Sequence, residues 1–587
     1  MNRAAVIHKA GQNFAFPVDE HSLKLRLKAA RSDLKEVKVI YGSRYPLDYK
    51  DPYLIKEMEL VGSDSLYDYF ETTIELDDNR FRYYFYLDDG DKGIWFSEKG
   101  FTDIRPHGVW GFGEYFQYPV INKNDIFDAP QWVCDAVFYQ IFPERFYNAN
   151  QNNDPEGVKE WGGKPRQKSF FGGDLEGIIK KMEYLEELGI NALYLTPIFT
   201  SSSNHKYNID DYYSIDPAFG DINIAKKLVE TAHQRGIRVV LDAVFNHCGY
   251  DFFAFKDVRE NGNESRYIDW FFVDETPVKT SSPVNYYTFA NDIKNMPKLN
   301  TSNPEVQEYL LEVAEYWIKE INIDGWRLDV ADEVDHQFWR KFRERVRSMK
   351  KDIYIVGENW HNSEDWLQGD QFDAIMNYPL GMAVLDFFSY NRIGPAEFNN
   401  RLIKNWMLYQ DEVNYSMLNL LDSHDTPRLL NLFSGDKQAM KLAVMFQLTY
   451  PGAPMIYYGD EIGMEGEGDP DCRRCMIWDE DQQDKLLYNY YKKLIEIRNA
   501  RISLRQGDYQ ACLIDQVRNL YGFSRSYCNE KTIILFNNSG QQQWYELKGD
   551  LLGYKEEISD QINNKVYKLS DNKYIINIPE YTGIILV

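Results

Sequence analysis

The sequence is poor in cysteine, and this scarcity excludes the class of small secreted domains that disulfides hold together. Six cysteines are scattered among 587 residues, whereas a disulfide framework needs closely spaced cysteines in a short chain. Cys472 and Cys475 form one CxxC pair. A zinc site would need a second pair, and a redox site would need a strand–helix context. We therefore interpret the pair as coincidental.

Long apolar runs are also missing. No stretch of about 18 apolar residues occurs, so we expect no membrane span and no membrane partner. The N-terminal segment contains no apolar run long enough for a signal peptide. Together these absences predict a soluble, cytoplasmic protein.

Positive charge is scarce relative to negative charge. The chain has 66 Lys and Arg against 91 Asp and Glu, which gives a formal net charge of −25. Such a surface repels the phosphates of nucleic acids, so no nucleic-acid partner is expected. A neutral substrate such as a sugar polymer is not excluded.

The length of the chain exceeds what one hydrophobic core supports, so several domains are expected. Residues 1–125 contain short alternating runs such as YDYFETTIEL (67–76) and RFRYYFYLDD (80–89), which predict an N-terminal β-sandwich. A similar pattern returns after residue 502 and predicts a C-terminal β-sandwich over 503–587.

Between these β domains, residues 126–502 alternate strand-like and helical segments. The eight strand candidates are VFYQIF, INALYLTP, IRVVLDAVFN, IDGWRLDV, IYIVGE, FDAIMNYP, SMLNLLDSHD and PMIYYGDE. Eight alternating β/α units predict a multidomain protein with a central (β/α)8 TIM barrel. After the third strand, residues 248–300 contain no barrel element, and this length favours an inserted subdomain over a loop.

The first long helix of the predicted barrel has clear boundaries in the sequence. Apolar residues recur at helical spacing in DLEGIIKKMEYLEELG (174–189). Asp174 is a suitable N-cap and Gly189 a suitable C-terminal stop. The pattern predicts one continuous helix over 175–188.

Charged and polar residues follow several of the predicted strands, where TIM barrels place their catalytic groups. One carboxylate at such a position is normally a cap or a salt-bridge partner, but several on one rim are costly to bury unless function requires them. The strand-end residues are Asp242, Asn246 and His247 on the third strand, Arg327 and Asp329 on the fourth, Glu358 on the fifth, and His424 and Asp425 on the seventh.

Two of these carboxylates suit the retaining hydrolysis of glycosides. That reaction needs one ionised nucleophile and one proton donor, about 5–5.5 Å apart. Neighbouring strands lie about 4.8 Å apart, so Asp329 and Glu358 can meet this requirement. Arg327 precedes Asp329 by two residues, points to the same side of the strand, and favours the ionised nucleophile. Glu358 follows an apolar run that suits a group holding a proton.

Four segments carry a family resemblance: DAVFNH (242–247), GWRLDVADE (325–333), VGENW (356–360) and LLDSHD (420–425). In order and spacing they resemble the conserved segments of the α-amylase family, and the resemblance extends over essentially the whole chain. It implies retaining cleavage of α-glucosidic bonds, with Asp329 as nucleophile, Glu358 as acid/base and Asp425 as a third acid that holds sugar hydroxyls. The substrate-binding residues that it implies are Tyr207, Asp242, His247, Arg327, Trp360, His361 and His424.

A narrower resemblance rests on MPKLN (296–300), VFYQIFPERF (137–146) and GDQFDAIMNYP (369–379). These are similar to the cyclomaltodextrinase, neopullulanase and maltogenic amylase subfamily. The resemblance implies α-1,4 and also α-1,6 cleavage in cyclodextrins, pullulan and short maltooligosaccharides, with transglycosylation as a side activity. It also implies a homodimer in which one N-terminal domain covers the partner's active site. Asp332 and Asn359 depart from the subfamily pattern and are expected to border the leaving-group subsites.

A calcium site is implied by NANQNND (148–154) and FFGGD (170–174), which resemble the subfamily's calcium loop. Oxygen ligands suit Ca²⁺, and an Asn-rich turn is the alternative. The implied ligands of a structural Ca²⁺ are Asn148, Asn150, Asn153, Asp154, Asp174 and the carbonyl of Gly172.

Three alternative functions compete with this hypothesis. A non-catalytic glucan-binding protein would be expected to lack Asp329, Glu358 or Asp425, and all three are present. A starch-type α-amylase fits poorly with the N-terminal β domain and the missing signal peptide. A dedicated glucan transferase stays open, because it shares the covalent intermediate and differs only in the acceptor.

Overall fold

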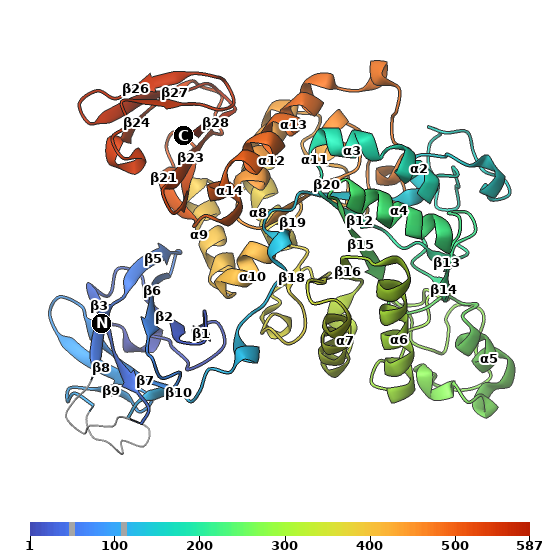
Figure 1. Cartoon of the computed structure of the whole chain (residues 1–587), viewed down its shortest axis with the longest axis horizontal. Helices are drawn as coiled ribbons and strands as arrows, with labels where there is room; N and C mark the ends of the chain where they lie inside the picture. Colours follow the sequence, from blue (N-terminus) through green and yellow to red (C-terminus); the bar gives the residue numbers. More distant parts are fainter. Residues whose placement is uncertain (46–52, 107–113) are drawn as a thin grey trace. The chain divides into compact units, whose positions relative to one another are not determined.

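The computed structural model describes residues 1–45, 53–106 and 114–587, and the chain forms two compact units (Figure 1). The first unit comprises Met1–Asp128, Ile393–Asn414 and Gln510–Gln516, and the second comprises Ala129–Arg392, Tyr415–Tyr509 and Val517–Val587. Within the described residues, no helix is both long and apolar enough to cross a membrane.

The first unit contains the predicted N-terminal β-sandwich, built from two antiparallel sheets. Alternate residues of β2, such as Leu23, Leu25 and Leu27, are fully buried and pack in one core with Val39 and Phe85 of the other sheet. This alternation is the pattern that a two-layer sandwich requires. One sheet has the order β1 (Ala15–Pro17), β2 (Ser22–Ala30), β6 (Tyr67–Glu75), β5 (Glu59–Ser63); the other has β4 (Leu54–Glu57), β3 (Glu36–Ser43), β7 (Phe81–Asp88), β8 (Gly93–Ser97), β9 (Gly100–Thr102), with β10 (Phe116–Tyr118) beside β7.

The second unit is built around the predicted barrel, and all eight predicted strands are confirmed. They pair in parallel in the order β18-β17-β16-β15-β12-β11-β20-β19, and a parallel bridge between Met376 and Leu418 joins the two ends of this sheet. The strands are buried on both faces, which explains their nearly continuous apolar sequences. Their bounds are β11 (Phe138–Ile141), β12 (Ala192–Leu195), β15 (Arg238–Ala243), β16 (Gly325–Leu328), β17 (Tyr354–Gly357), β18 (Ala374–Ile375), β19 (Leu418–Asn419) and β20 (Ala453–Tyr457).

The predicted helix over 175–188 is interrupted, so the prediction of one continuous helix was wrong. Asp174 caps its start, with Oδ1 accepting the N–H of Gly177 at 2.6 Å, and Gly189 ends it at φ 94°. Lys181 breaks it at φ −101°, ψ 8°. The Lys181 ammonium lies 4.4 Å from the ring centre of Tyr147 and 4.1 Å from that of Trp478.

The helices are divided between the two units, and α9 belongs to the first. Their bounds are α1 (Pro143–Phe146), α2 (Leu175–Lys180), α3 (Met182–Leu188), α4 (Ile222–Gln234), α5 (Phe253–Asn261), α6 (Pro304–Ile321), α7 (His336–Met349), α8 (Tyr378–Phe388), α9 (Pro395–Trp406), α10 (Asp411–Ser416), α11 (Leu429–Leu432), α12 (Lys437–Thr449), α13 (Lys485–Ala500) and α14 (Ile502–Gln506).

The inserted subdomain predicted after the third barrel strand is confirmed. It contains α5, which the sequence did not reveal, and a set of isolated antiparallel bridges. One of these pairs His247 with Lys298, and so the insert returns to the end of β15. A separate two-stranded sheet of β13 (Phe199–Ser201) and β14 (Ile209–Ile215) follows β12.

The C-terminal β domain is also confirmed, as antiparallel sheets. Its strands within the second unit are β22 (Leu520–Tyr527), β23 (Glu530–Asn537), β24 (Gln543–Lys548), β25 (Glu557–Ser559), β26 (Val566–Lys568), β27 (Lys573–Ile578) and β28 (Thr582–Leu586). The strand β21 (Gln510–Asp515) falls in the first unit.

Candidate active site

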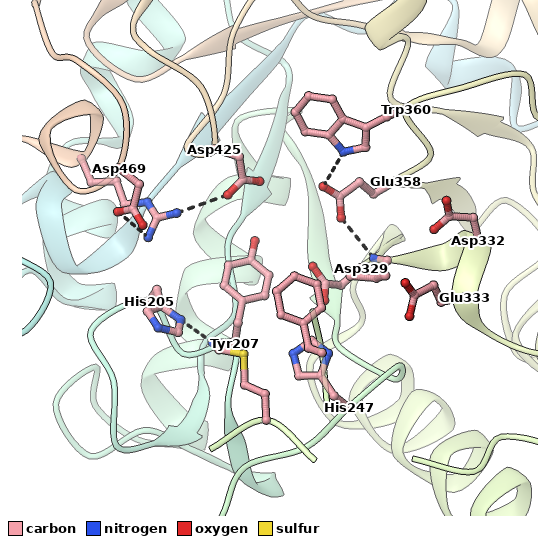
Figure 2. A pocket seen from close by; sticks show the side chains of 14 residues that line it. His205, Tyr207, His247, Asp329, Asp332, Glu333, Glu358, Trp360, Asp425 and Asp469 are labelled. Carbon is pink, nitrogen blue, oxygen red and sulfur yellow. Dashed lines mark hydrogen bonds and ion pairs between the residues drawn. The ribbon is translucent and has the colours of Figure 1, made fainter. Parts of the chain in front are cut away.

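A cavity of about 520 Å³ opens at the carboxyl ends of the barrel strands (Figure 2). Six of the residues predicted from the sequence line it: Tyr207, His247, Asp329, Glu358, Trp360 and Asp425. The other lining residues are His205, Phe289, Met296, Val330, Asp332, Glu333, Asp469 and Arg473.

The barrel register sets Asp329 beside Glu358. Leu328, the last residue of β16, pairs with Gly357, the last residue of β17. The next residue on each strand therefore emerges at the same level, and the Glu358 N–H donates to the Leu328 carbonyl at 2.9 Å. Both side chains point into the cavity (Figure 2), and both are nearly buried, at 6% and 8% exposed.

Arg327 joins the carboxylates of three neighbouring strands. Its Nη1 donates to Asp329 Oδ1 at 2.8 Å and to both oxygens of Asp242 at 3.1 Å. Its Nη2 forms an ion pair with Glu358 Oε2 at 2.8 Å. The guanidinium is fully buried behind the cavity, so one positive charge balances part of the charge on three carboxylates.

Burial raises the pKa of Asp329 well above its usual value; Arg327 opposes this effect, and Glu358 and Asp242 add to it. Burial likewise raises the pKa of Asp242 to about 6, against the opposing charge of Arg327. The expected contact between Arg327 and Asp329 is therefore present and acts in the expected direction. The loss of hydration outweighs it, because a single guanidinium is shared by three acids.

Val330 directly follows Asp329 and has a strained backbone. Its φ of 44° and ψ of 48° lie in the left-handed region, where a β-branched residue is an outlier. In this conformation its N–H donates to Glu358 Oε2 at 3.1 Å. The other oxygen, Oε1, accepts from Trp360 Nε1 at 3.2 Å, and the Trp360 ring stacks on Tyr378 at 3.6 Å. Both oxygens of Glu358 thus have a fixed donor.

A chain of hydrogen bonds through Gln140, His424 and Asp242 holds the Tyr207 side chain in position. Gln140 Nε2 donates to His424 Nδ1 at 2.8 Å, which leaves the proton of the neutral ring on Nε2. That nitrogen lies 2.6 Å from the Tyr207 hydroxyl, and the hydroxyl donates to Asp242 at 2.9 Å. Burial lowers the pKa of His424 well below its usual value, so the ring is neutral. The Tyr207 ring is therefore held in place.

His247 presents an unused hydrogen-bonding atom to the cavity. The ring is buried beside Phe289, with ring centres 5.0 Å apart, and its buried Nε2 has no hydrogen-bond partner within the described residues. Burial lowers the pKa of His247 to about 3, so the ring is neutral. An unpaired buried polar atom is costly unless a ligand satisfies it.

Asp425 also lines the cavity, and Arg473 and His424 hold its carboxylate in place. Arg473 Nη2 donates to its Oδ1 at 3.2 Å, and His424 Nε2 lies 3.3 Å from Oδ2. Arg473 also pairs with Asp469 at 3.1 Å. Sequence reasoning did not assign a role to Arg473 or Asp469. The available signal was the charged DCRR run (471–474) that follows the eighth barrel strand.

The inserted subdomain contributes Phe289 and Met296 to the cavity wall, which sequence reasoning also missed. Lys298 attaches this wall to the barrel: its Nζ bonds to Asn246 and lies 2.9 Å from Glu333 Oε2. The signal was present, because Met296 and Lys298 belong to the MPKLN segment that suggested the subfamily.

The predicted residues Asp242, Arg327 and His424 lie behind the cavity lining and contact it through the groups described above. His361 does not line the cavity either; it is exposed and bonds to Asp332 at 2.9 Å. Asp332 borders the cavity as expected. Asn359 was expected to do so but is fully buried, with Nδ2 donating to Ser363 Oγ at 3.0 Å. That expectation was wrong, because its side chain points away from the rim.

The predicted calcium loop fits an oxygen-coordinated ion. The buried Oδ1 atoms of Asn148 and Asn153 have no hydrogen-bond partner within the described residues. A Cβ on Gly172, which has φ 80°, would lie 2.2 Å from Asp154 Oδ1, so the loop is closely packed there. Asp174 accepts the N–H groups of Ala149 and Asn150 and caps α2, and Asn150 Oδ1 accepts the N–H of Asn152. These bonds hold the loop in shape.

The sequence and the fold of this chain are similar to those of known glycoside hydrolases. Residues 140–507 match the family model of the alpha amylase catalytic domain, and residues 1–122 match that of the alpha amylase N-terminal ig-like domain. A cyclomaltodextrinase from Thermoanaerobacter pseudethanolicus (strain ATCC 33223 / 39E) is 50% identical over 98% of this chain and 100% of its own. Neopullulanase 2 from Thermoactinomyces vulgaris is 47% identical over 92% of each chain. A solved structure of a cyclomaltodextrinase is 42% identical and covers 100% of both chains at a TM-score of 0.95. The chain therefore belongs to the α-amylase family of glycoside hydrolases.

Proposed function

We propose that this enzyme hydrolyses α-glucosidic bonds in cyclodextrins, pullulan and short maltooligosaccharides, with retention of configuration. The identity to a cyclomaltodextrinase and a neopullulanase over nearly their full lengths supports the substrate class. The observation that carries the mechanism is the contact of one guanidinium with both Asp329 and Glu358, each at 2.8 Å.

In the first step, Asp329 attacks the anomeric carbon of the bound sugar. The bond from this carbon to the glycosidic oxygen breaks, and Glu358 transfers its proton to that oxygen. Asp329 loses its negative charge as the covalent bond forms, and Glu358 gains one. Because Arg327 contacts both groups, it stabilises the charge before and after this transfer.

In the second step, the carboxylate of Glu358 takes a proton from a water molecule that attacks the same carbon. The bond to Asp329 breaks, and its carboxylate is restored. The fixed donors on Glu358, the Val330 N–H and Trp360 Nε1, keep the carboxyl group at one position for both steps. A sugar hydroxyl in place of water would give transglycosylation by the same chemistry.

Substrate recognition is assigned to other residues that line the cavity and to His361 outside it. The unpaired Nε2 of His247 would bond to a sugar hydroxyl, and Asp425, fixed by Arg473, would hold two hydroxyls of the reacting ring. The Tyr207 ring offers a flat surface for this sugar. Trp360 and the exposed His361 would contact the leaving part of the substrate.

Ca²⁺ is proposed as a structural ion of the loop formed by 148–154 and 170–174. Asn148, Asn150, Asn153, Asp154, Asp174 and the Gly172 carbonyl would hold it, and it would supply a charge that orders the loop. Chelation should lower the melting temperature by a few degrees, and Ca²⁺ should restore it. An Asn148→Ala variant that responds to chelation exactly as the wild type does would contradict this assignment.

Domain limits of 1–125, 126–502 with an insert at 248–300, and 503–587 are proposed, together with a cytoplasmic homodimer. All six cysteines are free thiols, which supports a reducing compartment.

The proposed function is tested by initial rates on β-cyclodextrin, pullulan and soluble starch measured in parallel. We expect cyclodextrin to be opened fastest, and Glu358→Gln to lower all three rates by about 10²–10⁴-fold. Starch cleaved far faster than cyclodextrin would reject the substrate class but keep the family. A predominance of transfer products over free sugars would favour the glucan transferase.

A further inference from the structure

A second cavity, of about 750 Å³, lies on the barrel-containing unit. It shares no lining residue with the candidate active site. Its volume is within the range of about 300–1,000 Å³ typical of ligand sites. The proposed catalytic steps use none of its lining residues, two of which, Asn148 and Asp154, belong to the proposed calcium loop.

The apolar part of this cavity includes four aromatic side chains, those of Tyr147, Trp161, Phe171 and Trp478. Each indole N–H is already bonded to a main-chain carbonyl, that of Trp161 to Met476 at 3.1 Å and that of Trp478 to Phe146 at 2.5 Å. The rings are therefore held in place before any ligand binds, which lowers the entropic cost of binding.

Trp161 is the aromatic ring best placed to meet a ligand. The Lys181 ammonium lies over the rings of Tyr147 and Trp478, so these faces are already in contact with a cation. Trp161 meets Tyr147 edge-on, with 6.5 Å between the ring centres. Trp161 is only partly buried.

The polar side chains of the cavity suit a neutral, hydroxyl-rich ligand. Glu160, Asp479 and Gln482 line it and are exposed, and Gln482 Nε2 donates to Asp479 at 2.7 Å. Carboxylates and amides can each bond to sugar hydroxyls. Glu160 and Asp479 are the carboxylates left for a ligand, because Asp154, which also lines the cavity, is assigned to the proposed calcium ion.

We propose that this cavity is a second, non-catalytic saccharide-binding site, in which Trp161 stacks on a glucose unit and the surrounding acids and amide bind its hydroxyls. The choice of an α-linked glucose oligosaccharide as the ligand rests on the proposed function. The site would hold a glucan on the enzyme while the active site cleaves another segment of the same glucan, or a second glucan molecule.

The test uses the full chain labelled with 5-fluorotryptophan and carrying Glu358→Gln, so that the sugar is not consumed. Trp161→Phe, Trp360→Phe and Trp544→Phe each assign one fluorine resonance by its disappearance. Maltotriose is then titrated. Trp360 reports on the active site, Trp161 on the second cavity, and Trp544, which is 56% exposed on β24, is the matched control.

We expect the Trp161 resonance to shift along a saturable curve that is independent of the Trp360 curve, while Trp544 does not move. Glu160→Ala should weaken the Trp161 curve severalfold and leave the Trp360 curve unchanged. A Trp161 resonance that stays fixed while Trp360 saturates, or that shifts only in parallel with Trp544, would overturn the second site. A fixed Trp360 with a saturating Trp161 would instead count against the proposed function.

Discussion

Arg327 determines the charge balance of the active site. It contacts Asp242, Asp329 and Glu358 within 3.1 Å, so a single positive charge faces three groups that can each carry a negative one. Ionising all three groups in a buried site costs free energy, because one guanidinium cannot balance three negative charges. Burial accordingly raises the pKa values of both Asp329 and Asp242.

The charge of Asp242 should set the acid limit of activity. Asp329 must be ionised to attack, and burial raises its pKa, with the charges of Glu358 and Asp242 adding to the rise. Asp242→Asn removes one of these charges, so the pKa of Asp329 falls and activity persists to lower pH. We expect the acid limb of kcat/KM to move down by about one pH unit.

The control for this prediction is Asp469→Asn, which removes a carboxylate that pairs with Arg473 at the other side of the cavity. Its acid limb should stay in place. An Asp242→Asn profile that is unchanged, or that moves to higher pH, would be incompatible with this account of the cluster.

The backbone strain at Val330 should be needed for activity. A side chain held in the left-handed region costs on the order of 1–3 kcal/mol. Val330→Gly removes this cost, so we expect unchanged or slightly higher stability. It also lets the backbone leave the conformation in which the residue 330 N–H donates to Glu358, so we expect kcat to fall by about tenfold. Urea unfolding and steady-state rates measure the two effects.

Asn322→Gly is the matched control, because Asn322 ends α6 at φ 57° and does not line the cavity. It should change stability alone. A Val330→Gly enzyme with wild-type kcat would show that the strained N–H does not position the acid.

Among individual residues, the sequence predicts the positions of those that directly follow barrel strands, and of few others. Asp329 and Glu358 could be placed together because the parallel register carries both to one level. Val330 gives no sign of its φ, since a Val after an Asp is ordinary. The burial of Asn359 depends on Ser363 and on the local turn, and no periodic pattern indicates it.

At the scale of secondary structure, the barrel strands were predictable because burial on both faces makes them continuously apolar. The break at Lys181 was not predictable, because apolar residues recur at helical spacing on both sides of it. The interior of the insert was missed for a different reason: apart from α5, it is held by isolated bridges without a regular period.

His8 should make the N-terminal sandwich sensitive to acid. Its ring bonds to the Arg26 carbonyl at 2.7 Å and the Tyr83 hydroxyl at 2.9 Å, and burial lowers its pKa from 6.5 to about 4. The unfolded chain therefore binds a proton below pH 6.5 that the folded unit excludes. Stability should decrease as pH falls from 6.5 to about 4, by roughly 3 kcal/mol in total.

Urea unfolding of the N-terminal unit at a series of pH values measures this loss. His8→Gln should flatten the dependence between pH 6.5 and 4, whereas His21→Gln, at an exposed position, should leave it intact. Equal slopes for the wild type and His8→Gln would rule out this source of acid sensitivity.

At the scale of the whole molecule, the proposed homodimer ties substrate choice to protein concentration. If a partner's N-terminal domain narrows the access to the active site, dissociation should open it to larger substrates. Dilution through the dissociation range, located by sedimentation, should therefore lower the ratio of β-cyclodextrin to starch activity. If the ratio of β-cyclodextrin to starch activity stays constant while the sedimenting mass halves, substrate selectivity does not depend on dimerisation.

In the proposed mechanism Asp329 forms a covalent bond to the sugar, with Glu358 as its acid/base partner, and this intermediate can be trapped. The Glu358→Gln enzyme is mixed with α-maltosyl fluoride, whose leaving group needs no proton, and digested for peptide mass spectrometry. We expect a maltosyl adduct on the peptide that contains Asp329, and none when Asp329→Asn is added. An adduct on another residue, or release of the β-anomer without any adduct, would contradict this mechanism.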